Sequence, residues 1–154
     1  MDGVWYPGGR ACPAGEAPLQ KRVQGLLRGV GLPTQSVLAS NLIFVRSKDQ
    51  ARLAQASRRA EQCWAIHRFL LEQTQPQSIL SFGGSKVFDF IVGHGTTRSS
   101  IEQYAAGHGD WKCQATRMAI GGRTFNLVSL PHLSRYAVDR YPDVIAWVRT
   151  KLGA

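Results

Sequence analysis

Apolar residues recur at helical spacing in three stretches of the chain. In the first stretch these residues are Leu19, Val23, Leu26, Leu27 and Val30, which predict a helix over residues 18–30. Its opposite side carries Lys21, Arg22 and Arg28, which is typical of a solvated face. A long run of helix formers predicts a second helix that ends before Pro76, with Asp49 as its N-cap. A last helix is predicted in YPDVIAWVRTKL at the end of the sequence.

Shorter apolar runs, rich in β-branched and aromatic residues, predict three buried strands. They are residues 42–45, the run SILSF before Gly83, and the run TFNLVSL before Pro131. Gly83 and Gly84 lead from the second strand into the short helix SKVFDFIV, which makes a βα unit. The Gly-rich runs VGHGTTRSS and AAGHGDW flank a middle that is expected to be loop-like. This order predicts an α/β fold, a three-layer α/β/α arrangement around a short, mainly parallel central sheet.

Composition limits the classes of protein to consider. The 154 residues, 44% of them apolar, suit a single domain spanning residues 1–154. No run approaches the length of a membrane span or has the form of a secretory signal, so we expect a cytoplasmic protein with no membrane partner. The expected oligomeric state is a monomer. A net charge of +9 favours a polyanionic partner, with nucleic acid as the leading candidate.

Cysteine and histidine spacing argues against a metal or cofactor. Cys12, Cys63 and Cys113 are far apart and odd in number, which indicates free thiols. The four histidines form no H-x-x-x-H pair on a predicted helix. We therefore expect neither a metal nor a cofactor.

Polar residues follow the last predicted strand, at the sheet edge where α/β proteins bind ligands. His132, Ser134 and Arg135 lie there. A serine hydrolase is not indicated, because no G-x-S-x-G elbow is present. His132 could donate a hydrogen bond to a developing anion, and Ser134 could contact a phosphate. In the alternative interpretation, His132 caps the strand end and Ser134 supports the chain turn.

The run FGGSK raises a related question about Gly83, Ser85 and Lys86. It lacks the G-x-x-x-x-G-K-[ST] spacing of a nucleotide-binding loop. Two interpretations remain, a tight turn with helix capping or a contact of these amides and Lys86 with a DNA phosphate.

The segments ASNLIFVRS, ILSFGGSKVFDF and LVSLPHLSRY, in this order, resemble the uracil-DNA glycosylase superfamily. The resemblance covers most of the chain, from about Tyr6 to the final helix. It implies a uracil-DNA glycosylase-like fold in which Asn41 recognises the pyrimidine edge and His132 stabilises charge on the departing base. Arg135 and Tyr136 would reach the minor groove beside a flipped nucleotide. Alternatively, Asn41 only begins a strand by bonding its own backbone.

One early motif departs from the family. In WYPGG, Tyr6 stands where members of that superfamily carry an Asp or Asn that positions the hydrolytic water. The resemblance still implies that Tyr6 lies beside the base. We also expect part of the family's first strand to be missing. The branch with an iron-sulfur cluster uses four cysteines, so the three found here argue against it.

Three functions remain open. The leading one is a DNA-repair hydrolase that cleaves the N-glycosidic bond of a flipped, damaged or deaminated base. The alternative is a non-catalytic nucleic-acid binder with the same fold. A third is an unrelated α/β enzyme acting on a phosphate ester, with FGGSK as its anion site.

Overall fold

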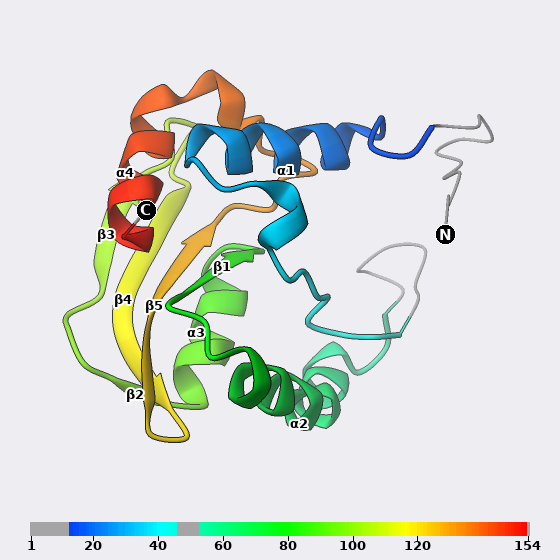
Figure 1. Ribbon diagram of the computed structural model, residues 1–154, viewed down its shortest axis with the longest axis vertical. Helices are drawn as coiled ribbons and strands as arrows, with labels where there is room; N and C mark the ends of the chain where they lie inside the picture. Colours follow the sequence, from blue (N-terminus) through cyan, green and yellow to red (C-terminus); the bar gives the residue numbers. More distant parts are fainter. Residues whose placement is uncertain (1–12, 46–52, 154) are drawn as a thin grey trace. The chain divides into compact units, whose positions relative to one another are not determined.

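The computed structural model describes residues 13–45 and 53–153, which form two compact units (Figure 1). We call Met1–Val37 together with Gln77–Ala154 the sheet unit, and Leu38–Pro76 the helical unit. Each is described here by itself. The prediction of one domain over 1–154 stays a prediction.

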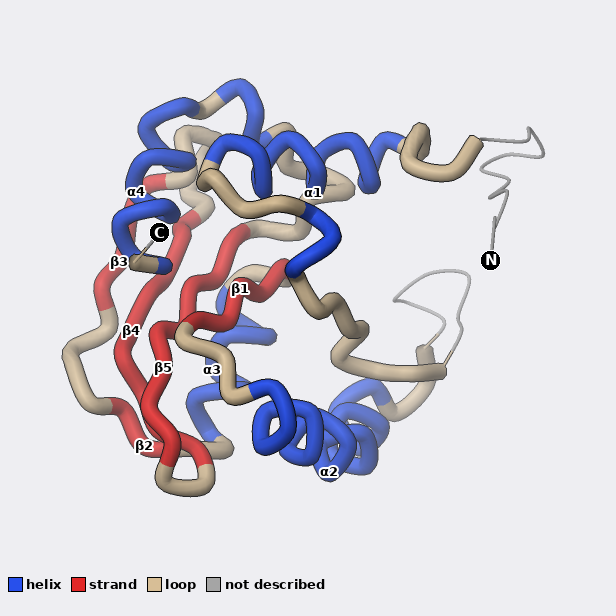
Figure 2. Tube along the Cα trace, in the orientation of Figure 1, coloured by secondary structure: helices blue, strands red, loops and turns tan. Residues whose placement is uncertain are grey.

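The sheet unit contains most of the regular structure (Figure 2). Its helices are α1 (Pro18–Gly29), α3 (Ser85–Gly93) and α4 (Pro142–Leu152), with short 3-10 helices at Thr34–Ser36 (η2) and Val138–Arg140 (η3). Its strands are β1 (Ser78–Phe82), β2 (Thr96–Thr97), β3 (Glu102–Ala105), β4 (Lys112–Ile120) and β5 (Arg123–Leu130). Five sequence predictions are thereby confirmed, namely the helices α1, α3 and α4 and the strands β1 and β5.

The sheet is mixed, so the predicted mainly parallel sheet is confirmed only in part. Its strand order is β1-β5-β4-β2, with β3 also paired to β4. Among the described strands, β1 and β5 pair in parallel, while the other three pairings are antiparallel. Gly121 and Gly122, with φ of 58° and 78°, turn β4 directly into β5 as a hairpin. Two residues with positive φ therefore place β4 antiparallel to β5, in a stretch where no strand was predicted.

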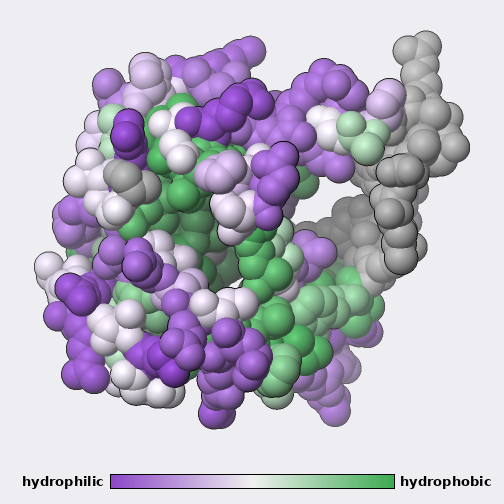
Figure 3. Space-filling model, in the orientation of Figure 1, coloured by the Kyte–Doolittle hydropathy of each residue, from purple (hydrophilic) through white to green (hydrophobic). Residues whose placement is uncertain are grey.

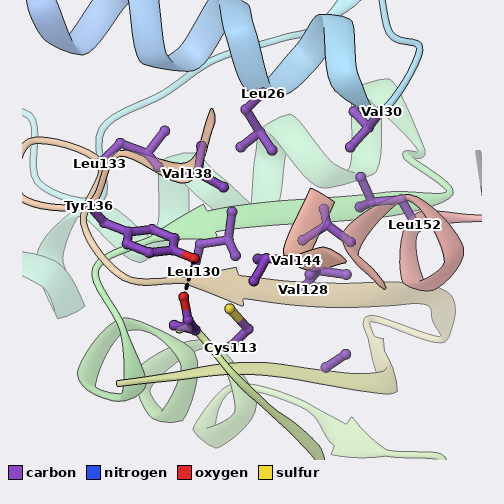
Figure 4. Packing of buried hydrophobic residues seen from close by; sticks show 13 residues of the cluster. Leu26, Val30, Cys113, Val128, Leu130, Leu133, Tyr136, Val138, Val144 and Leu152 are labelled. Atoms are coloured by element: carbon purple, nitrogen blue, oxygen red, sulfur yellow. Dashed lines mark hydrogen bonds between the residues drawn. The ribbon is translucent and has the colours of Figure 1, made fainter. Parts of the chain in front are cut away.

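Helices cover both faces of this sheet because alternate side chains of its strands point to opposite sides. On one face, Val128 and Leu130 of β5 pack in one buried cluster with residues of α1 and α4, including Leu26 and Val148 (Figure 4). Leu127 belongs to the opposite face of β5, and α3 contacts both β4 and β5. The layered α/β arrangement is thus present, and likeness to the uracil-DNA glycosylase fold stays a prediction.

The helical unit contains α2 (Ala56–Thr74), which ends before Pro76 as predicted. Residues 53–55 are not helical and Gln55 occupies the N-cap position with φ of 56°, so the helix begins later than a cap at Asp49 would require. Asp49 itself lies outside the described residues.

The predicted strand at residues 42–45 is wrong, because this segment packs on α2 instead of pairing in a sheet. His67 Nε2 lies 3.0 Å from the Leu42 carbonyl oxygen, and the Phe44 ring stacks on the His67 ring at 5.2 Å. Ile66 and Phe69 of α2 are exposed, and apolar surface is visible over this helix in Figure 3. The apolar residues of 42–45 therefore contact helix α2 and do not form a strand.

Candidate functional site

The residues that follow β5 form a compact turn, which we call the strand-end loop (residues 131–136). Leu133 and Tyr136 are buried, with 0% and 1% of their surface exposed, while His132, Ser134 and Arg135 are exposed. The His132 carbonyl accepts hydrogen bonds from the backbone N–H groups of Arg135 (2.9 Å) and Tyr136 (3.1 Å). The buried side chains of Leu133 and Tyr136 and these two hydrogen bonds fix the backbone of the loop. They thereby hold His132, Ser134 and Arg135 at the surface.

The imidazole of His132 is oriented by its own loop. The backbone N–H of Ser134 donates to His132 Nδ1 at 3.1 Å, and Ser134 Oγ lies 2.7 Å from the same nitrogen. A backbone N–H can only donate, so Nδ1 is the lone-pair nitrogen and the proton of the neutral ring is on Nε2. The loop therefore presents an Nε2–H donor on an exposed side chain. Ser134 also supports the turn, as the alternative interpretation of the sequence proposed.

Arg22 of α1 holds the strand-end loop by two hydrogen bonds. Its Nη1 donates to the carbonyl oxygens of Leu133 at 2.6 Å and Ser134 at 2.8 Å. The sequence pattern assigned Arg22 to a solvated face, and this structural role was missed. The contact joins residues more than 100 positions apart, so helical periodicity carried no signal for it.

Tyr136 belongs to the core, and its predicted role beside a flipped nucleotide is wrong. Its hydroxyl donates to the Ala106 carbonyl at 2.6 Å, shown as the dashed line in Figure 4, and its ring stacks on Tyr141 at 5.2 Å. Burial raises the pKa of Tyr136, and the neighbouring Cys113 and Tyr141 raise it further. A side chain packed and bonded in this way is not available to enter a groove.

Removing the Tyr136 hydroxyl tests this assignment. Tyr136→Phe keeps the ring but leaves the buried Ala106 carbonyl without its donor, so we expect a loss of about 1–3 kcal/mol in unfolding free energy. DNA affinity should stay unchanged. Urea unfolding and an oligonucleotide titration measure the two effects, and a clear loss of affinity in a stable variant would restore the groove role.

The turn between β1 and α3 meets the end of β5. The N–H groups of Gly83 and Gly84 both donate to the Leu130 carbonyl, at 3.1 and 3.0 Å. Gly83 has φ of 149°, and a Cβ there would lie 2.4 Å from Val87 Cγ2, so the position requires glycine. The tight-turn interpretation of FGGSK is therefore confirmed for Gly83, whose N–H is used within the fold, and the predicted phosphate contact of this amide is wrong.

This junction brings together two groups of predicted site residues. Ser85 and Lys86 occupy the exposed first turn of α3, directly after the glycines bonded to Leu130. His132 follows Leu130 by two residues. The ends of β1 and β5 thus place both segments at one edge of the sheet, as parallel neighbours do.

The two predicted base-binding residues are Tyr6 and Asn41. Tyr6 is outside the described residues. Asn41 is exposed in an irregular segment of the helical unit, and Ser40 Oγ donates to its backbone carbonyl at 3.4 Å. It is therefore not at a strand end. The predicted recognition of a base edge by Asn41 stays a prediction.

Cys113 has no features of a nucleophile. It is buried beneath Tyr136 in the cluster of Figure 4, and burial raises the pKa of its thiol to about 12. Within 13–45 and 53–153, no three His, Cys, Asp or Glu side chains are grouped so that they could hold a metal ion. No helix in this described part has the length and apolar character to cross a membrane.

Comparisons with known proteins return no match to a protein-family model, a curated protein or a solved structure.

Proposed function

We propose that the chain is a DNA glycosylase-like hydrolase that releases a flipped, damaged or deaminated base. One observation carries this proposal: the Ser134 N–H bonds to Nδ1 of exposed His132, which leaves Nε2–H as a donor directed by the loop rather than by solvent. Resemblance to the uracil-DNA glycosylase superfamily supports it.

The chemistry needs such a donor. Hydrolysis breaks the bond between the sugar C1′ and the base nitrogen, and the bonding electron pair stays with the base. The oxygen of water bonds to C1′, and its proton passes to solvent or to the released base. A donor set in place before the reaction, such as His132 Nε2–H at a carbonyl oxygen of the base, lowers the cost of this developing charge by about 3–4 kcal/mol.

Other predicted residues have supporting parts in the proposal. Asn41 would pair with the edge of the base, since an amide both donates and accepts hydrogen bonds. Arg135 and Lys86 are exposed cations near the same sheet edge, where phosphates of the strand would lie. The net charge of +9 would attract DNA without regard to sequence.

A panel of oligonucleotides tests the activity directly. Each carries one uracil, hypoxanthine, xanthine or mispaired thymine, and alkali-labile abasic sites are counted after incubation. We expect release from at least one substrate. If the protein binds these DNAs but yields no abasic product from any of them, the proposed glycosylase activity is rejected.

Asn41→Ala tests the base-recognition part on whichever substrate is cleaved. We expect release to fall by about tenfold or more, because one good base-edge pair contributes about 1–3 kcal/mol. Asn41→Asp is the matched control for chemistry, since it keeps the size of the side chain but cannot donate. Undiminished release by Asn41→Ala would remove this residue from the site.

A non-catalytic nucleic-acid binder is the second candidate, and one observation favours it. Neither the strand-end loop nor the sequence Gly83–Lys86 carries a carboxylate that could activate water, and Tyr6 replaces the family's Asp or Asn. This candidate predicts DNA affinity that falls steeply as salt rises, without abasic product. Affinity independent of salt would contradict it.

A further inference from the structure

A second loop lies against the strand-end loop and is held there by the core. It comprises residues 106–111, between β3 and β4, and we call it the aromatic loop. Ala106 accepts the Tyr136 hydroxyl at 2.6 Å, and the Trp111 and Tyr136 rings meet edge to face with centroids 6.3 Å apart. The backbone of Tyr136 in turn bonds to His132. The two loops are therefore neighbours in the sheet unit, connected through Tyr136.

The aromatic loop is itself well defined. Ala106 N–H donates to the Trp111 carbonyl at 2.9 Å, and Trp111 N–H donates to the His108 carbonyl at 3.2 Å. Gly107 has φ of 74°, and a Cβ there would lie 2.7 Å from the Tyr141 ring. Only glycine lets this turn approach Tyr141 so closely. The position of Trp111 is thus determined by backbone bonds and ring contacts.

Trp111 nevertheless leaves part of its ring uncovered. Its exposed fraction is 36%, and the exposed His108 ring meets it edge-on at 4.7 Å. Lys112 and Arg135 are exposed cations on the two neighbouring segments, and Asp110 is the single acid of the aromatic loop. An exposed aromatic ring with cations on neighbouring segments suits a base together with its phosphates.

We propose that Trp111, supported by His108, stacks on an unpaired base of a single-stranded nucleic acid bound along the strand-end loop. Bases inside a duplex already stack on each other, so an exposed ring gains a partner only where a base is unpaired. The proposal rests on the proposed function for its choice of DNA as the polymer. The preferred substrate is then single-stranded DNA, or DNA opened next to the target base. Trp111 takes the place beside the nucleotide that was expected for Tyr136.

Fluorescence anisotropy with a labelled 12-base oligo(dT) and a duplex of equal length tests this preference. Trp111→Ala should weaken binding to the single strand by about 5- to 150-fold and change duplex affinity by less than about twofold. Trp111→Phe, which keeps a ring against Tyr136, should retain most of the affinity. Unchanged single-strand affinity in Trp111→Ala, or an equal loss for both DNAs, would overturn the proposal.

Tryptophan quenching provides a readout that does not depend on how well the alanine variant folds. Trp147 of α4 stacks on Tyr104 at 5.4 Å and serves as the matched control. We expect oligo(dT) to quench wild-type fluorescence, Trp111→Phe to lose this response, and Trp147→Phe to keep it. Persistent quenching in Trp111→Phe would contradict the inference.

The failure of this inference can be told apart from failure of the proposed function. Oligo(dT) carries no damaged base, so its binding to the wild type and to Trp111→Ala tests stacking whether or not the wild type releases a base. Matching oligo(dT) and single-stranded RNA titrations identify the polymer. RNA could bind more strongly than oligo(dT) and quench the tryptophan fluorescence, a response that Trp111→Phe loses. That result would support stacking and reject DNA as the partner.

Discussion

Replacing His132 by alanine is expected to slow base release by about 100- to 1,000-fold. The Nε2–H donor acts on charge that develops as the glycosidic bond breaks, so its loss should affect the rate of the chemical step rather than binding. Single-turnover release at saturating protein concentration measures the rate, and anisotropy with the same oligonucleotide should give an affinity within about twofold of the wild type.

Ser134→Ala is the matched control for this prediction. It removes the hydroxyl 2.7 Å from Nδ1 but keeps the backbone N–H that orients the ring. We expect a rate loss of less than about tenfold, because the main hydrogen bond to Nδ1 remains. Full activity in His132→Ala would exclude His132 from the reaction, and an equal loss in both variants would point to disruption of the loop.

Replacing Phe88 by alanine is expected to produce the largest loss of stability, about 3–5 kcal/mol of unfolding free energy. The Phe88 ring is fully buried in α3, which contacts β1, β4 and β5. Its removal leaves a cavity beneath the helix that begins at the glycine turn. Chemical denaturation followed by circular dichroism measures the change.

Phe90 is the matched control in the same helix. Its ring is half-buried and lies 4.5 Å from the His94 ring at the end of α3. We expect Phe90→Ala to cost less than half as much as Phe88→Ala, because less apolar surface leaves water on folding. Equal losses of unfolding free energy in the two variants would contradict the deeper burial of Phe88.

Local chemistry in the sequence was enough to predict several elements. Helical spacing predicted α1 and α4, and the run SILSFGG predicted both β1 and the glycine turn into α3. The polar residues after β5 were expected at a sheet edge, and the structure places the glycine turn at the same edge. These predictions succeeded because each depended on neighbouring residues, whose periodicity and φ preferences act over a few positions.

Predictions that required distant partners were less successful. Tyr136 was interpreted as a surface residue because it follows His132 and Ser134, yet its hydroxyl bonds to Ala106, 30 positions away. Residues 42–45 have the composition of a strand, but Phe44 stacks on His67 of α2. Likewise, nothing in α1 alone indicates that Arg22 holds the strand-end loop. In each case long-range packing outweighed the local pattern.

By itself, the sequence determined the α/β class, the places of most helices, and the presence of His132 after a buried strand. The tertiary structure alone decided the antiparallel pairing of β4, the burial of Tyr136, and the exposure of Trp111 beside the strand-end loop. The physical reason is that periodicity selects a helix or strand from nearby residues, whereas pairing, burial and exposure depend on which distant side chains compete for the same space.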